Sequence, residues 1–198
     1  MVRYNNDMDL FDVIHPLIDA HKDEEDIEIE FRFGKHNGKL FDTNVGKDVW
    51  SRVLKGLKKY DGWERVDSSV SDVYYNDSSN VRITRNNDTN EQSMIQKITV
   101  VKKDFTRDPL DVRICISREI PTSGEYDMDR VRTKTRHSFV RKNLSIDMTI
   151  STGDNLDKDS EDETSYQIEL EIVNPSKIDN LRNILQKITD VSKLFPCS

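Results

Sequence analysis

Residues 26–34 read DIEIEFRFG, and apolar and charged side chains alternate along the whole stretch. Side chains of a β-strand point alternately to its two faces, so this pattern predicts a strand with one apolar face and one charged face. The charged face carries Glu28, Glu30 and Arg32, two carboxylates and a guanidinium side by side. In an ordinary sheet such a face simply points to water. The remaining strands decide whether that holds here.

The same alternation continues through most of the chain. It predicts seven further strands, at residues 70–77, 80–86, 93–102, 109–120, 131–141, 143–152 and 165–173. Apolar residues at helical spacing predict three helices, at residues 7–21, at residues 47–60 and from Pro175 onward, with Pro16 shortening or kinking the first. Short polar turns such as 86–90 and 123–126 link the strands, and the acidic stretch 153–163 reads as a solvated loop. A closed barrel is therefore expected.

The three amphipathic helices need an apolar sheet surface on which to pack. In a closed barrel the apolar rows supply that surface on the outside, and the charged rows then face the interior. The sequence thus predicts an α+β protein dominated by β structure, a closed eight-stranded antiparallel β-barrel or tunnel with a charged interior and about three helices outside. A narrow interior filled with charges costs energy unless the charges pair or hold a ligand.

The bulk composition sets limits on function. The 198 residues, 34% hydrophobic and 34% charged, suit one folded domain spanning residues 1–198. A net charge of −7 argues against a broad basic surface for nucleic acid, so cations that bind a polyanion must be concentrated in one place. Cys115 and Cys197 lie far apart and suggest neither a disulfide framework nor a zinc site. Without a signal peptide or a long apolar run, a soluble intracellular protein is expected.

The charged rows contain an acidic set and a basic set. The acidic set is Glu28, Glu30, Glu169 and Glu171, and the basic set is Arg82, Lys97, Arg113, Arg132, Lys134 and Arg136. A divalent metal ion carrying a polyphosphate satisfies both, because carboxylates bind Mg²⁺ or Mn²⁺ and the basic groups bind phosphate oxygens. The simpler interpretation is that each row is a solvated strand face, or that residues 132–136 form a basic edge that discourages aggregation.

Four motifs carry a resemblance to a known family. EIEF at 28–31 and ELEI at 169–172 resemble the two glutamate motifs of the triphosphate tunnel metalloenzymes, specifically the metal-dependent RNA triphosphatases of mRNA capping in fungi, protozoa and large DNA viruses. RTKTRHSF at 132–139 resembles the Arg-x-Lys-x-Arg row of that family, and IDMTI at 146–150 resembles its Asp-x-Thr strand. The chain looks most like the triphosphatase domain of a giant-virus capping enzyme.

The resemblance implies a role for each candidate residue. Glu28, Glu30, Glu169 and Glu171 would bind Mg²⁺ or Mn²⁺, while Arg82, Lys97, Arg132, Lys134 and Arg136, with Arg113 beside them, would hold the phosphates. Glu119 and Asp147 would orient a basic side chain or the attacking water, Thr149 would hydrogen-bond near them, and Asp72 would be a further member. Two positions depart from the family pattern. Gln167 replaces a frequent third acid, and Arg32 replaces the lysine of relatives that act on small triphosphates, which favours the RNA branch.

The implied activity is hydrolysis of the γ-phosphate of RNA with a 5′-triphosphate end, the first step of mRNA capping, together with hydrolysis of nucleoside triphosphates. A guanylyltransferase partner, separate or in the same polypeptide, and a viral factory or virion location are expected, with no membrane. Two alternatives stay open. One is a tunnel hydrolase of nucleoside triphosphates, thiamine triphosphate or polyphosphate. The other is a non-catalytic barrel that binds a phosphorylated partner or serves as a protein-interaction module, with its charges paired to one another.

Overall fold

The computed structural model describes residues 7–38, 40–154 and 163–195. Its helices are α1 (Asp7–His21), α2 (Lys47–Leu57) and α3 (Leu181–Ser192), with a short 3₁₀ turn, η1 (Pro175–Lys177). Its strands are β1 (Ile27–His36), β2 (Phe41–Asp42), β3 (Arg65–Asn76), β4 (Val81–Asn86), β5 (Gln92–Phe105), β6 (Asp111–Pro121), β7 (Arg130–Arg141), β8 (Leu144–Gly153) and β9 (Thr164–Ile172). No helix in these described ranges is long and apolar enough to cross a membrane.

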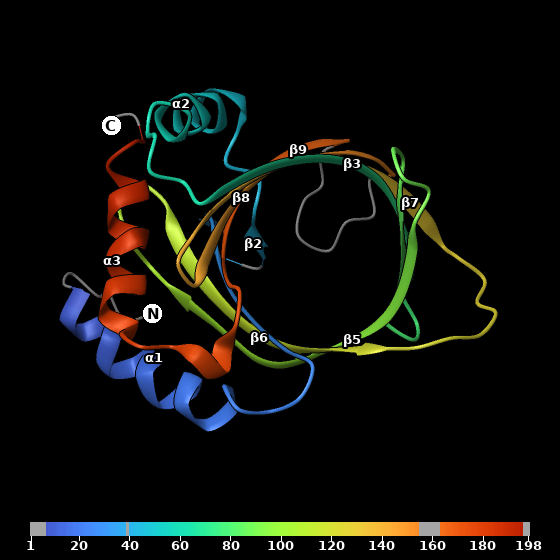
Figure 1. The fold of residues 1–198 in the computed structure, drawn as a ribbon, viewed down its shortest axis with the longest axis horizontal. Helices are drawn as coiled ribbons and strands as arrows, with labels where there is room; N and C mark the ends of the chain where they lie inside the picture. Colours follow the sequence, from blue (N-terminus) through green and yellow to red (C-terminus); the bar gives the residue numbers. More distant parts are fainter. Residues whose placement is uncertain (1–6, 39, 155–162, 196–198) are drawn as a thin grey trace.

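Eight strands form a closed antiparallel barrel, as the sequence predicts. Their order is β1-β6-β5-β4-β3-β7-β8-β9, and β9 pairs with β1 to complete the ring. Figure 1 shows this ring with all three helices gathered on one side of it. The additional strand β2 lies beside β1.

The apolar rows of the strands face outward to the helices. Ile29, Phe31 and Phe33 of β1 are at most 1% exposed and belong to the same buried cluster as Ile14 of α1 and Ile188 of α3. Alternation then turns the even-numbered residues of β1 to the opposite side. The hydrophobic core therefore lies between barrel and helices, and the lumen is left to the polar rows.

The ends of two helices differ from the sequence prediction. Pro175 begins only the turn η1, and α3 starts at Leu181 after Asn180, whose side chain accepts a hydrogen bond from the Asn183 backbone N–H. The side-chain cap at Asn180 determines this boundary. Helix α2 ends at Leu57, three residues early, and α1 runs through Pro16, which lies exposed on its surface. Most of the predicted acidic loop 153–163 lies outside the described residues.

Strand β2 is a wedge in the barrel wall. β1 pairs with β9 only from Glu30 to Arg32, and beyond that point β2 takes the place of β9 beside β1. Asn44 and Val45 then bond to the backbone of Tyr166 in β9. A Cβ atom on Gly34 would collide with the backbone of β2 and meet the Phe41 ring at 2.5 Å, so glycine is required for β2 to approach β1.

Candidate active site

With the exception of Asp72, every candidate residue from the sequence lies on the inward face of its strand. The strand registers show this, because pairs directly opposite each other share a face. Arg32 lies opposite Arg113 and Glu169, Lys97 lies opposite Glu119, and Arg136 lies opposite Thr149. Glu30 is 4% exposed. The charged face of β1 therefore points into an enclosed lumen and not to bulk water.

One half of the lumen is organised around Lys97. Its Nζ is 3.0 Å from Oε1 of Glu119 and 3.6 Å from Oε1 of Glu30, and it also pairs with Glu28. Arg82 pairs with the same oxygen of Glu119. Four strands thus contribute to one connected group of charges, with a single ammonium among three carboxylates.

The second half continues from Glu30. Nη2 of Arg32 lies 2.8 Å from Oε1 of Glu30, and Nε of Arg32 lies 3.1 Å from Oε1 of Glu169. Arg136 is 3.6 Å from Glu169 and 3.3 Å from Asp147. These contacts join both halves into one ion-pair network, consisting of Glu28, Glu30, Arg32, Arg82, Lys97, Glu119, Arg136, Asp147 and Glu169.

Hydroxyl groups fix the Asp147 end of the network. Ser145 donates a hydrogen bond of 2.7 Å to Asp147, and Nε of Arg136 donates one of 3.2 Å to Thr149. Asp147 is 4% exposed and Thr149 is fully buried. The guanidinium of Arg136 is consequently held in one orientation, with its charge directed at two carboxylates.

Crowding of carboxylates perturbs their acidity. Burial, together with the nearby charge of Glu30, raises the pKa of Glu28 to about 8. Burial and the charge of Asp147 raise the pKa of Glu171 to about 7. Burial also disfavours the charged form of Glu30, but Arg32 and Lys97 outweigh it and lower that pKa to about 2. Around Glu28 and Glu171, burial and neighbouring carboxylates therefore outweigh the nearby cations.

The donor set fits a hard divalent cation. Glu28, Glu30, Glu169 and Glu171 offer only oxygen, and the buried Oε1 of Glu30 receives no well-aligned hydrogen bond despite the nearby Arg32. In the part of the chain that the structure describes, no three acidic, histidine or cysteine side chains form a ready-made metal cage. Mg²⁺ typically keeps several waters and uses one or two carboxylates plus substrate phosphates, so a preformed cage is not required.

Three basic candidates lie apart from the ion-pair network. Arg132 is fully buried and donates to the Ser151 hydroxyl at 2.7 Å and to backbone carbonyls of Ser151, Asp154 and Glu163. Arg113 forms a two-pronged pair with Asp104, and Lys134 lies 6.0 Å from the centre of the Tyr75 ring. Asp72, expected at the site, is on the outer face, where it accepts a hydrogen bond from Thr133. Asp72 is an even-numbered residue of β3, whereas odd-numbered residues of this strand, such as Ser71, face the lumen.

The sequence assigns no role in the site to Arg32, a network member, or to Ser145, which bonds to the network. It places Arg32 on the charged face beside Glu28 and Glu30 and marks it as a departure from a lysine pattern, and in the structure Arg32 bridges Glu30 and Glu169. Ser145 gave no signal, because a serine on a polar strand face is ordinary. The even spacing of Arg32 from Glu30 was the available clue, since it places both side chains on one face.

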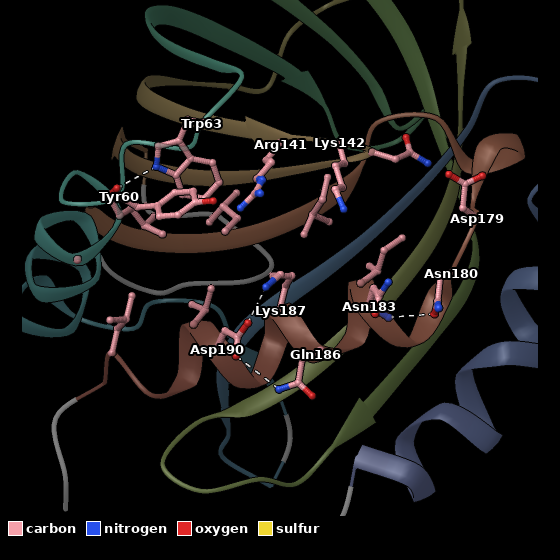
Figure 2. Close-up of a pocket in the computed structure, with 18 of the residues that line it drawn as sticks. Tyr60, Trp63, Arg141, Lys142, Asp179, Asn180, Asn183, Gln186, Lys187 and Asp190 are labelled. Atoms are coloured by element: carbon pink, nitrogen blue, oxygen red, sulfur yellow. Dashed lines mark hydrogen bonds and ion pairs between the residues drawn. The ribbon is translucent and has the colours of Figure 1, made fainter.

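A separate groove of about 640 Å³ lies outside the barrel, between α2, α3 and the β7–β8 turn. Figure 2 shows Tyr60 and Trp63 on one side of it and Lys187 and Asp190 of α3 on the other. The two aromatic rings meet edge to face at 5.2 Å. Leucine and isoleucine side chains contribute to the lining of this groove.

A closed antiparallel barrel with carboxylates and basic groups interlocked in its lumen defines the class of triphosphate tunnel proteins. The sequence family described as "mRNA capping enzyme, beta chain" matches residues 58–195. This match spans most of the chain, and the chain therefore belongs to that family, the RNA triphosphatases of mRNA capping. It is a hydrolase acting on the 5′-triphosphate of RNA, and the family is metal-dependent.

Among the solved structures that share the fold are two RNA triphosphatases. The RNA triphosphatase Pct1 of S. pombe is 18% identical, with a TM-score of 0.69, and the match covers 96% of this chain and 86% of that one. The Mimivirus capping enzyme triphosphatase is 15% identical, with a TM-score of 0.66, and the match covers 98% and 100%. A search of curated protein sequences finds no match.

Proposed function

We propose that the ion-pair network is the active centre at which the γ-phosphoanhydride of triphosphate-ended RNA is hydrolysed. One observation carries this assignment. Carboxylates and cations from seven strands form a single connected network inside an enclosed barrel, with five carboxylates to four cations. Phosphoryl transfer depends mainly on positioning and on electrostatic stabilisation, and this arrangement supplies both.

The basic side chains of the network would bind the phosphates. Arg82, Lys97 and Arg136 each form an ion pair with a carboxylate in the lumen. When substrate binds, phosphate oxygens would replace part of these contacts. Lys134 makes no ion pair within the described residues, so its ammonium is available to the same ligand. We assign Arg132 and Arg113 supporting positions in the wall, because their guanidinium groups are already bonded to it.

Glu28, Glu30, Glu169 and Glu171 would hold Mg²⁺ or Mn²⁺, directly or through water. When bound, such an ion supplies positive charge that neutralises the γ-phosphate. We assign Glu171 the orientation of the attacking water, because in the described part of the chain it makes no ion pair with a cation. Glu119 and Asp147 keep Lys97 and Arg136 directed at the phosphates.

Substitution of two network glutamates tests the assignment. Glu30→Ala and Glu169→Ala should abolish phosphate release from triphosphate-ended RNA with Mn²⁺ or Mg²⁺, while circular dichroism shows a folded barrel. Glu24→Ala is the matched control, since Glu24 pairs with Arg118 outside the lumen. Retention of wild-type activity by both folded lumen variants would show that the chemistry occurs elsewhere.

The preferred substrate requires a direct comparison. We propose that RNA is preferred, because Arg32 stands where relatives acting on small triphosphates have lysine. Hydrolysis rates of triphosphate-ended RNA, ATP, thiamine triphosphate and inorganic polyphosphate, each with Mg²⁺ and with Mn²⁺, decide this. A higher kcat/KM for any of the last three would assign the chain to the other tunnel hydrolases. Absence of metal-dependent release from all four would support a non-catalytic phosphate-binding barrel.

We infer that residues 1–198 act as one triphosphatase domain beside a guanylyltransferase partner, which uses the diphosphate-ended product. Pct1 has been solved in complex with the Spt5 CTD, so a relative of this fold binds a partner segment. The external groove is the surface we assign to the partner, since Arg141, Lys142 and Lys177 line it and suit an acidic segment. The double variant Arg141→Glu, Lys142→Glu should weaken binding of a guanylyltransferase and leave phosphate release unchanged; unchanged binding would refute the assignment.

A further inference from the structure

The two ends of the lumen are lined differently. Toward β2, the inward side chains are tightly packed. Phe41 is 1% exposed, Thr43 is 2% exposed and Arg113 is 8% exposed, although all three belong to the polar interior and not to the core beneath the helices. Burial of an aromatic ring in a polar lumen requires neighbours that exclude water from it. The contacts of Phe41 show what those neighbours are.

Phe41 and Arg113 stack on each other. The guanidinium carbon of Arg113 lies 4.4 Å from the centre of the Phe41 ring, within the range of a cation–π contact. Along its edge the same guanidinium donates two hydrogen bonds to Asp104, from Nε at 2.6 Å and from Nη2 at 2.9 Å. Side-chain contacts thereby link β2, β6 and β5 along this end of the barrel wall.

The neighbouring strands continue this layer. Nε2 of Gln167 donates to the Thr43 hydroxyl at 3.3 Å, which connects β9 to the segment after β2. Arg132 of β7 is fully buried against Ser151 of β8. We name this layer the end wall; it consists of Phe41, Thr43, Asp104, Arg113, Arg132, Ser151 and Gln167.

The opposite end is lined by small polar side chains. Ser69 and Ser71 of β3 share the inward face with Arg136 and Lys134, and Ser138 of β7 shares it with Asp147. All three serines are partly exposed. Further along the same rim, Thr84 of β4 lies opposite Ser93 of β5. The side chains of this serine-lined mouth are short and partly exposed, whereas Phe41, Thr43 and Arg132 at the end wall are buried.

We propose that the tunnel is closed by the end wall, that a triphosphate enters through the serine-lined mouth with its γ-phosphate leading, and that Phe41 and Arg113 exclude any group attached to the γ-phosphate. The proposal rests on the function assigned above, because it takes the ion-pair network as the position of the phosphates. The γ-phosphate leads because the nucleoside and the RNA chain behind it stay outside the mouth. Phe41 then determines substrate specificity without touching the reacting atoms of the correct substrate.

Two esters of ATP on the γ-phosphate provide the test. The methyl and phenyl esters carry equal charge and differ in the size of the added group. Each is measured as a competitive inhibitor of metal-dependent ATP hydrolysis by the wild-type protein. We expect the phenyl ester to bind at least about tenfold more weakly than the methyl ester, since a packed region does not accept extra atoms without strain.

Removal of the Phe41 ring should relieve this discrimination. In Phe41→Ala, and to a smaller degree in Phe41→Leu, the ratio of the two inhibition constants should fall toward one. Leu40→Ala is the matched control, because Leu40 is 47% exposed and adjoins Phe41 in the chain. Phe41→Leu keeps an aliphatic group in place and so serves if the alanine variant does not fold.

Equal inhibition of the wild-type protein by both esters would overturn the closed end. An unchanged ratio in a folded Phe41 variant would overturn the assignment to Phe41. Neither result touches the proposed function, which fails separately if the wild-type protein releases no phosphate from ATP or from triphosphate-ended RNA with either metal.

Discussion

Replacement of Lys97 by methionine removes the cation at the centre of three carboxylates. Lys97 contacts Glu28, Glu30 and Glu119, and its side chain is 18% exposed. Breaking a buried ion pair by removing one partner destabilises a protein by about 3–5 kcal/mol, because the remaining charge is left uncompensated. Since this lumen retains some contact with water, we expect a loss at the lower end, about 3 kcal/mol.

The assay is thermal unfolding of metal-free protein at pH 7.5. For a chain of this length a loss of about 3 kcal/mol corresponds to a decrease in Tm of about 6–12 °C. Lys187→Met is the control, because Lys187 forms a similar 2.7 Å pair with Asp190 on the surface, where its side chain is 51% exposed. Surface pairs contribute only about 0–1 kcal/mol.

A second measurement separates charge from packing. At pH 5.5 the unpaired carboxylates can take up protons, so the difference in Tm between Lys97→Met and wild type should shrink. The reasoning fails if Lys97→Met loses no more stability than Lys187→Met at pH 7.5. It also fails if the loss of stability is the same at both pH values, since that loss then comes from altered packing and not from unpaired charge.

Three further outcomes are expected. The pKa of Glu28, about 8, and that of Glu171, about 7, are raised above the unfolded value near 4.5, so the folded state binds more protons than the unfolded state at intermediate pH. Metal-free protein should therefore lose stability as pH rises from about 5 to 8. Measurements of Tm against pH in EDTA test this, and Mn²⁺ should reduce the decrease in Tm with pH. Gly34→Ala should destabilise the barrel, because its Cβ meets the backbone of β2, and urea unfolding would show no change if β2 packed elsewhere. Arg132→Lys should lower Tm, because lysine cannot reach the carbonyls of both Ser151 and Glu163, and a Tm equal to wild type would contradict that role.

The lumen was predictable because strand periodicity leaves little freedom. Once Ile29 and Phe31 are assigned to the helix side, Glu28 and Glu30 must lie on the other, and the same reasoning applies to Glu169 and every charged row. Closure of the barrel followed from the need of the helices for an apolar surface. Alternation gives the face of a residue, however, and not its partner.

What the sequence did not reveal depends on contacts between distant strands. Strand β2 is only two residues long and exists because Gly34 lets it approach β1. The commitment of Arg132 to backbone carbonyls depends on where β8 and β9 begin and end. The outward direction of Asp72 depends on the phase of the alternation within β3, a strand of 12 residues. Each case is decided by register, which no local pattern contains.

A blind tunnel has a consequence for the order of cap synthesis. After a guanylyltransferase has acted, the phosphate chain carries a nucleoside at both ends, and neither end can be threaded past the aromatic ring that seals the lumen. The finished cap would then be safe from the enzyme that prepared the RNA for it, with no need for release, relocation or inhibition of that enzyme. The two residues of β2 would thus prevent the triphosphatase from hydrolysing an RNA end that has already been capped.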